Sequence, residues 1–272
     1  MNDRVTITVE GGVADVRLTR ADKMNALDDR MFEALIAAGE RLKSESGLRA
    51  VVLSGEGRAF CAGLDMGAFG RMADGSRKID PARDGGLASR THGIANRAQY
   101  AVWVWREVAV PVIAAVHGVA FGGGFQLCLG ADMRFVTPDA RLAVLEIKWG
   151  LVPDMAGTQL MRHLAREDIV RELTYTGRIF SGEEALAMGF ATRVSADPRA
   201  EALAVAREIA GKSPDAVRAA KRLLNQAVTV DPAGGFIHET AEQMALIGSP
   251  NQAETVMANL QKRAPVFSDP KA

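Results

Sequence analysis

Apolar and polar residues alternate with a period of two at the start of the chain. Residues 5–9 (VTITV) and 13–19 (VADVRLT) show this alternation, with Gly11 and Gly12 between them. The pattern predicts two antiparallel strands joined by a tight turn. In MFEALIAAGERL the spacing lengthens to that of a helix, and Asp28 stands just ahead, where an N-cap residue accepts a hydrogen bond from the first turn. The chain is therefore predicted to open with a hairpin and a helix.

Two apolar stretches further along each run into glycine. Residues 49–54 (RAVVLS) predict a short buried strand, and GEGRAFCAGLDMG then places Gly63 ahead of a helix expected near Leu64. The second stretch, IAAV from residue 113, reaches three consecutive glycines at 122–124 before an apolar segment that predicts a helix. The first amides of a helix have no partner inside it, and glycine lets a ligand approach the backbone. Two such turns predict two N–H donors converging on one oxyanion.

The middle of the chain contains a long segment without periodicity. Residues 67–89 are rich in Gly, Asp, Arg and Ser, and a stretch of this length is typically a functional lid or disordered. We interpret it as a mobile flap beside the site, with an inert loop as the alternative. Residues 92–107 then predict a helix, and residues 133–137 predict a further strand.

Helical spacing alone continues after Thr158. A capping box, Ser181 with Glu184, and an N-cap with proline behind it, Ser213 with Pro214, mark two helix starts. Strands mixed with helices and then helices alone indicate an α/β core, residues 1–197, followed by a C-terminal helical region, residues 198–272. The helices predicted after Thr158 cover residues 159–165, 168–176, 182–188, 198–211, 214–227, 233–247 and 251–262.

Composition narrows the class of protein. The chain has 272 residues, 48% of them apolar, which is enough for a large core. The 33 basic and 33 acidic residues cancel, so no overall field favours nucleic acid or an anionic membrane. Cys61 and Cys128 lack a CxxC spacing, so we interpret them as free buried thiols and expect no metal. Without an apolar leader or an 18-residue apolar run, the expected location is the cytosol.

Polar residues that could act beside the second glycine turn are few. Gln126 follows Gly123 by three positions, a spacing that places both on one helix face. Glu146 and Asp154 are the next candidates, on a segment interrupted by Gly150 and Pro153.

Three spaced motifs now carry a close resemblance. RAFCAGLDM (58–66), IAAVHGVAFGGGFQLCLGADMR (113–134) and EIKWGLVPDMAGTQ (146–159) resemble the crotonase, or enoyl-CoA hydratase/isomerase, superfamily, and the similarity covers nearly the whole chain. The resemblance implies an α/β fold, a crotonase-type spiral of ββα units with an α-helical C-terminal trimerisation region. It also implies an acyl-CoA thioester substrate in fatty-acid or related metabolism, trimers or hexamers, and no cofactor, because coenzyme A is part of the substrate. The long flap, Trp103 and Trp105 would shape the acyl pocket.

The family pattern also implies site residues. The amides of Leu64 and Gly123 would form the oxyanion hole. The coenzyme A part would lie along residues 20–27, and Lys262 or Arg263 would reach the nucleotide of a neighbouring subunit. The residues carried over as contacts of coenzyme A are Lys23, Ala26, Arg58, Ala62, Asp65, Gly122 and Lys262.

The chain departs from the family at one catalytic position. Hydratases use two glutamates to hold and deprotonate a water, and here the first is Gln126 while the second is Glu146. A glutamine cannot take a proton near neutral pH, so two-carboxylate hydration should be handicapped. A Δ3,Δ2-enoyl-CoA isomerase needs mainly the carboxylate matching Glu146, and the dienoyl-CoA isomerase branch carries an aspartate where this chain has Asp154. We expect Glu146 to be the base, Asp154 a helper acid or a modulator of its pKa, and Gln126 a pocket residue that orients substrate or water. Asp154 could instead only cap the following helix.

Other classes of protein fit less well. The four histidines, His92, His117, His163 and His238, lie in no GxSxG context, which disfavours a serine hydrolase, and we expect His117 to hydrogen-bond at a strand end. A non-catalytic RNA-binding relative should carry a lysine-studded helix, whereas residues 28–46 balance their basic residues with acidic ones. An idle paralogue that only binds acyl-CoA remains a third reading, and the presence of Glu146 argues against it.

Overall fold

The computed structural model describes residues 3–74 and 86–270. Its strands are β1 (Val5–Glu10), β2 (Val13–Leu18), β3 (Ala50–Gly55), β4 (Val112–Val116), β5 (Val119–Phe121), β6 (Met133–Val136), β7 (Arg141–Ala143) and β8 (Arg193–Val194). Its α-helices are α1 (Asp29–Lys43), α2 (Met66–Ala73), α3 (Arg97–Glu107), α4 (Gly123–Leu129), α5 (Gly157–Met161), α6 (Glu167–Thr176), α7 (Gly182–Met188), α8 (Pro198–Ala210), α9 (Pro214–Gln226), α10 (Pro232–Leu246) and α11 (Pro250–Leu260). Two 3-10 turns, η1 (Ala21–Lys23) and η2 (Glu146–Trp149), complete the elements of the described residues.

The main sheet has six strands in the order β1-β2-β3-β4-β6-β8. The predicted hairpin is confirmed: β1 and β2 are antiparallel, and Gly11 and Gly12 both take positive φ angles. The other neighbours pair in parallel, so their connections must cross over one face of the sheet. A second sheet contains β5 and β7, also parallel, which the sequence pattern did not predict because each has only three residues.

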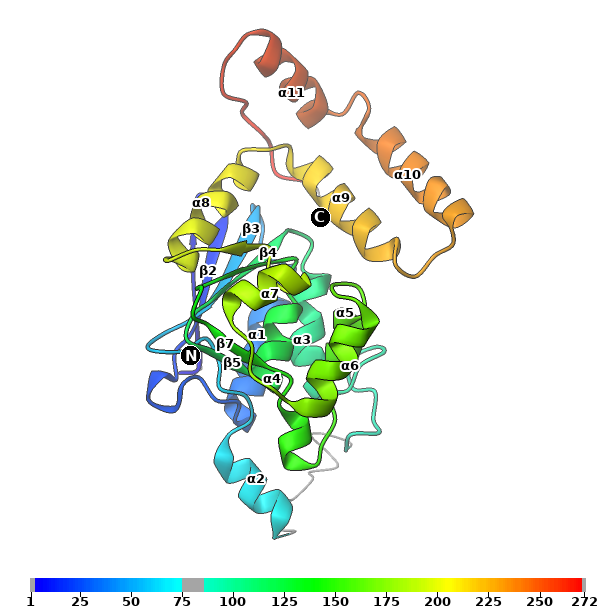
Figure 1. The fold of residues 1–272 in the computed structure, drawn as a ribbon. Coiled ribbons are helices and arrows are strands. Elements are labelled where there is room, and N and C mark those ends of the chain that lie inside the picture. Colours follow the sequence, from blue (N-terminus) through cyan, green and yellow to red (C-terminus); the bar gives the residue numbers. More distant parts are fainter. Residues whose placement is uncertain (1–2, 75–85, 271–272) are drawn as a thin grey trace.

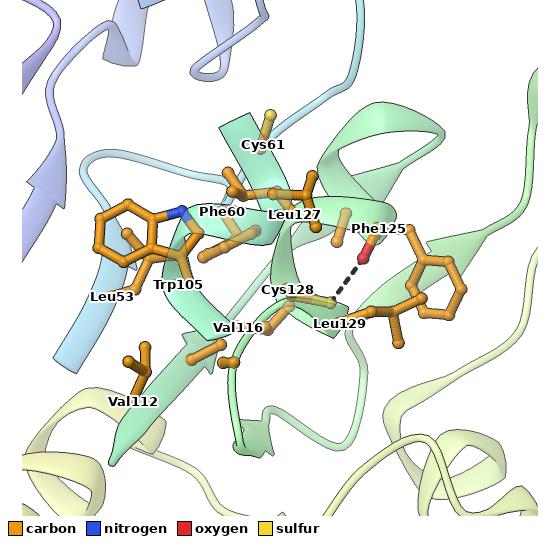
Figure 2. Packing of buried hydrophobic residues seen from close by; sticks show 14 of the residues in the cluster. Leu53, Phe60, Cys61, Trp105, Val112, Val116, Phe125, Leu127, Cys128 and Leu129 are labelled. Atoms are coloured by element: carbon orange, nitrogen blue, oxygen red, sulfur yellow. Dashed lines mark hydrogen bonds between the residues drawn. The ribbon is translucent and has the colours of Figure 1, made fainter. Parts of the chain in front are cut away.

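The period of two along the strands divides the core between the two sheet faces. Val52, Ala115 and Phe135 face α8 and pack with Ala202 and Ala206 of that helix. Neighbouring positions point to the opposite face, where the larger core lies between the sheet and helices α1, α3 and α4. Figure 2 shows the larger core, to which β3, β4, α3 and α4 contribute the labelled side chains Leu53, Val112, Val116, Trp105, Leu127 and Leu129. The segment that follows β4 is thus held on a rigid support.

Helix starts agree with the predictions where a local cap decides them. The side chain of Asp28 accepts from the amide of Met31, and Ser181 and Glu184 form the predicted capping box. The helix predicted over residues 92–107 begins only at Arg97, because Asn96 forms a capping box with Gln99. Pro214 is the first residue of α9 as expected, although Ser213 makes no side-chain cap hydrogen bond.

The first glycine turn differs from its prediction. Leu64 does not start a helix: it forms a parallel bridge with Leu27, and α2 begins two residues later, at Met66. Part of the segment interpreted as a structureless flap, residues 67–89, is therefore helical, and residues 75–85 of it lie outside the described part of the chain. The flap interpretation stays a prediction for the remainder.

The C-terminal helices divide into two groups. Helix α8 packs on the main sheet, whereas α9, α10 and α11 extend away from it (Figure 1). Lys221 ties α9 to the core: its buried ammonium donates to the carbonyl of Val110 and the carboxylate of Asp132, both at 2.8 Å, and to the carbonyl of Trp105 at 3.3 Å. The domain boundary at residues 197/198 stays a prediction. Helix α8, which begins just after this boundary, packs on the sheet of the core.

Candidate active site

Three segments distant in sequence run side by side at one place. The amide of Leu27 donates to the carbonyl of Gly63 at 2.8 Å, and the amide of Asp65 donates back to Leu27 at 3.0 Å. On the other side of this segment, the amide of Phe121 donates to the carbonyl of Cys61 at 3.1 Å. The residues around Gly63 are therefore held between the segment before α1 and the end of β5.

Glycines make this close approach possible. A Cβ added to Gly63 would lie 2.5 Å from the carbonyl oxygen of Phe121, and one added to Gly124 would lie 2.2 Å from that of Cys61. Gly63 also takes a φ of +86°, in the left-handed region that favours glycine. Because the main chain itself fills the contact, a side chain at either position would force the two segments apart.

The two amides proposed for the oxyanion hole lie in this contact. A Cβ on Gly63 would be 3.6 Å from the amide nitrogen of Gly123, and the amide of Leu64 follows Gly63 directly. Within the described residues, neither the Leu64 nor the Gly123 N–H donates to another backbone group. Gly123 is the first residue of α4, where helix geometry provides no internal acceptor. The arrangement offers two uncommitted donors from different segments.

Glu146 brings a carboxylate to the same place. It begins the turn η2 behind β7, and only 9% of it is exposed. A Cβ built on Gly122 would lie 3.2 Å from its Oε1, so the carboxylate lies against the backbone that leads into Gly123. Gln126 donates from Nε2 to Oε1 at 2.6 Å, whereas the buried Oε2 has no hydrogen-bond partner among the described residues.

Burial dominates the electrostatics of Glu146. Removal from water raises the pKa of its carboxyl group, because the charged form loses solvation, and the nearby charge of Asp154 raises it further. The backbone amide of Glu146 and the hydrogen bond from Gln126 act in the opposite direction, because both stabilise the carboxylate. A carboxyl group with a raised pKa both takes and returns a proton more readily near neutral pH.

Gln126 is held more firmly than the sequence analysis expected. It is 1% exposed, and its Oε1 accepts from the amides of Met155 and Gly157, both at 2.9 Å. These two donors and the bond to Glu146 fix the side chain, so Gln126 links Glu146 to the loop before α5. The expectation that it orients substrate or water stays a prediction.

Asp154 lies on that loop, at an exposed position next to Met155. The N-cap of α5 is Ala156, which takes a φ of +66° and offers no side-chain cap. Asp154 is therefore not the N-cap residue of α5. Its charge raises the pKa of Glu146, and its role as a helper acid or modulator stays a prediction.

The residues expected to contact coenzyme A lie partly together. Lys23 and Arg58 are exposed, and the amide of Ala62 donates to the carbonyl of Met24 at 2.9 Å, which joins the segments that carry them. Asp65 pairs with Arg20 at 2.8 Å and accepts from the amide of Gly67.

The remaining coenzyme A candidates are occupied or distant. Ala26 is buried and its carbonyl accepts from Arg20 at 3.0 Å, and the amide of Gly122 donates to Ala143. Lys262 lies two residues beyond the end of α11, which in Figure 1 lies at the opposite end of the molecule from α2. Within one chain, Lys262 is therefore not brought to the site.

Asn25, which none of the sequence motifs identified, positions the first glycine turn. Asn25 is fully buried and takes a φ of +55°. Its side-chain Nδ2 donates to the carbonyls of Glu56 and Ala59 at 3.0 and 2.9 Å. The signal was present, because asparagine tolerates the left-handed region better than most residues.

Several other candidates can now be placed. Trp105 is fully buried in the larger core, where its indole N–H donates to the carbonyl of Ala101, so it is a packing residue. Trp103 is half-buried, and its part in an acyl pocket stays a prediction. His117 donates to the carbonyl of Gly57 at 2.9 Å, at the end of β4 as expected. Cys61 and Cys128 are free and buried, and burial raises the pKa of each thiol to about 12.

Comparison with known proteins assigns the family. Residues 8–270 match the enoyl-CoA hydratase/isomerase family, and the chain belongs to it. It is 29% identical over 263 residues to mouse mitochondrial methylglutaconyl-CoA hydratase, covering 94% of this chain and 79% of that protein. It is 31% identical over 272 residues to human mitochondrial Delta(3,5)-Delta(2,4)-dienoyl-CoA isomerase, covering 98% and 79%. The crystal structure of enoyl-CoA hydratase from Bacillus anthracis superposes with a TM-score of 0.86 at 27% identity, covering 97% and 98%.

These similarities confirm the predicted family, the enzyme class and the crotonase-type fold. Among the helices of residues 3–74 and 86–270, none is long and apolar enough to cross a membrane.

Replacing Glu146 by glutamine should stabilise the fold at neutral pH. The folded state raises the pKa of this carboxyl group, so it binds the proton more tightly than the unfolded chain does. The stabilisation from that proton is complete below the unfolded pKa, about 4.3, and is lost as the pH rises through the folded pKa. Urea unfolding of the wild type and Glu146→Gln should therefore give a stability difference in favour of the variant at pH 8 that shrinks towards pH 4. A difference independent of pH would contradict this account.

Proposed function

We propose that the protein is an acyl-CoA enzyme of the enoyl-CoA hydratase/isomerase type in which Glu146 is the acid/base group. The observation that carries this proposal is the carboxylate itself: it is buried, it lies against Gly122, and its Oε2 has no partner among the described residues. A buried carboxylate of raised pKa next to two uncommitted amides is the arrangement that proton transfer beside a thioester requires.

In the proposed mechanism, the amides of Leu64 and Gly123 bind the thioester oxygen. As negative charge develops on that oxygen, both N–H groups stabilise it, and loss of one such donor typically lowers the rate by about 10²–10³. Glu146 takes the proton from the carbon next to the thioester, and the electron pair moves into the enolate. In isomerisation the same carboxyl group returns the proton at the γ carbon, so the double bond moves. In hydration, water adds across the double bond through the same type of enolate.

The second candidate function is isomerisation without hydration, and the hydrogen bonds of Gln126 favour it. Gln126 occupies the place of the first hydratase glutamate, and its carbonyl is already used by the amides of Met155 and Gly157. It cannot accept a proton, so the proton transfers are proposed for Glu146, the carboxylate that it contacts. The charge of Asp154 supports its proposed role as a modulator of the pKa of Glu146. A Δ3,Δ2-enoyl-CoA or dienoyl-CoA isomerase with little hydratase activity would use such a site.

The coenzyme A part is proposed to lie along residues 20–27. The exposed Lys23 and Arg58 support this placement, because a hydrogen bond from the Ala62 amide to Met24 joins the segments that carry these two cations. Coenzyme A is then part of the substrate and no separate cofactor is needed. Nucleic acid is not an expected partner. The cytosolic location stays a prediction, since relatives include mitochondrial enzymes.

Self-association into a trimer or hexamer is proposed for the C-terminal helices. Within one chain α10 buries none of its residues, and Phe236, Ile237 and Met244 are 66%, 68% and 72% exposed. Leu224 on α9 and Leu260 on α11 are also largely exposed, so apolar surface extends over all three helices. Lys262, which lies away from the site in its own chain, could reach coenzyme A only in a neighbouring subunit.

The test of function is a panel of 2-enoyl-, 3-enoyl- and 2,5-dienoyl-CoA thioesters with the products resolved by chromatography. We expect bond migration to exceed water addition, and Glu146→Gln to lose at least about 10²-fold of either activity because the base is removed. Binding of a saturated acyl-CoA by the variant is the control for an intact site. An active Glu146→Gln enzyme would overturn the proposed role of Glu146.

Substituting Gln126→Glu should raise the hydration of crotonyl-CoA. Glutamate keeps an oxygen for the amides of Met155 and Gly157 and adds the missing second carboxyl group. The measurement is the rate of loss of the conjugated thioester absorbance, with folding and acyl-CoA binding checked in parallel. An unchanged hydration rate in a folded, binding-competent variant would count against this view of the site.

Sedimentation velocity tests the proposed assembly. We expect the wild type to sediment with the mass of three or six chains, and the double variant Phe236→Glu/Ile237→Glu to sediment as a single chain, since charges in an apolar interface are costly. Glu239→Gln, an exposed change on the same helix, is the matched control and should leave the assembly intact. A wild-type protein that sediments as one chain would refute the proposal.

A further inference from the structure

We infer that Gln126 is a positioning residue that holds Glu146 as a base with a single working oxygen. The inference rests on the proposed function of Glu146 and adds to it the group that orients this carboxylate and selects which of its oxygens exchanges the proton.

The two faces of the Gln126 amide are assigned by their partners. Its Oε1 lies 2.9 Å from each of two main-chain N–H groups, those of Met155 and Gly157, which can only donate. The NH₂ group must therefore be the one that lies 2.6 Å from Oε1 of Glu146. The reverse orientation would set the amide carbonyl against a carboxylate and leave two buried donors facing the NH₂ group.

The loop before α5 is shaped around this carbonyl. Ala156 takes a φ of +66°, which turns the amides of the residues on either side of it towards one point. Position 157 has room only for glycine, because a Cβ on Gly157 would lie 2.6 Å from Oε1 of Gln126. A non-glycine residue stays in the left-handed region only where surrounding contacts hold it there. Here the contacts are the two hydrogen bonds from the Met155 and Gly157 amides to the Gln126 carbonyl.

This arrangement makes the two oxygens of Glu146 unequal. Oε1 accepts the hydrogen bond from Gln126, and Oε2 is buried without a partner among the described residues. Since Gln126 is fixed by the loop, the carboxylate cannot exchange its oxygens without breaking a charge-assisted hydrogen bond. Oε2 is then the oxygen that takes the proton from one carbon of the substrate and returns it to another.

The same clamp connects both carboxylates of the site. Met155 directly follows Asp154, so the amide that binds Gln126 belongs to the loop that carries the second acid. A glutamine that never ionises adds no competing charge 2.6 Å from Glu146, whereas a glutamate there would have to share a proton with it. Gln126 thus suits a site with one base.

The test is the titration of Glu146 itself. Protein labelled with ¹³C at the glutamate side-chain carboxyl carbon is titrated by NMR, and the Glu146 signal is assigned by its absence in Glu146→Gln. In Gln126→Met the hydrogen bond that favours the carboxylate is lost, so the midpoint should rise by about one pH unit. The acid limb of the kcat profile on the best thioester should move upward by the same amount, with little change in KM. Gln159→Met, at an exposed glutamine of α5, is the matched control and should keep both midpoints.

A second variant covers the case in which Gln126→Met does not fold. Gln126→Glu keeps an acceptor for the loop amides and should give a coupled titration in two steps, the upper one above the wild-type midpoint. Midpoints equal to the wild type in the folded variants would overturn the inference. If the wild type acts on none of the thioesters, the proposed function fails, and the NMR titration still decides the role of Gln126.

Discussion

Packing of main chain directly on main chain is the constraint on which the site depends. Gly63 and Gly124 have no room for a Cβ because the carbonyls of Phe121 and Cys61 occupy that space. This contact places Gly63, the residue before Leu64, against the main chain that leads into Gly123, without any polar side chain. A main-chain N–H has no side-chain rotamers to be ordered, and it needs no reorganisation when charge develops. The larger core beneath α4, visible in Figure 2, holds the contact in place.

Glu146 shows the opposing requirement, an ionisable group in a place where charge is unfavourable. Its burial raises the pKa of the carboxyl group and costs stability at neutral pH, while the hydrogen bond from Gln126 recovers part of that loss. A compromise of this kind between stability and reactivity fits the acid/base role proposed for Glu146. The C-terminal helices present a comparable imbalance on a larger scale, since α10 leaves Phe236 and Ile237 in solvent when the chain is alone.

Local chemistry explains what the sequence predicted well. The hairpin at Gly11 and Gly12, the cap at Asp28 and the capping box at Ser181 each depend on residues within a few positions of one another. The helix boundaries after Thr158 mostly agree within two residues for the same reason. The family motifs predicted Leu64, Gly123 and Glu146 as one site. The structure places Gly63, the residue before Leu64, beside Gly123, and the Glu146 carboxylate beside Gly122.

The sequence by itself thus determined the family, the hairpin, the longer strands of the main sheet, most of the helices and the residues around which a site could form. Tertiary structure alone decided how they are used. Leu64 is extended because Leu27 pairs with it, and Trp105 is a core residue because the sheet covers it. Gln126 is a clamp because its carbonyl finds amides 29 and 31 positions away. Partners at such separation leave no periodic or local signal, since only the packed fold brings them within hydrogen-bonding distance.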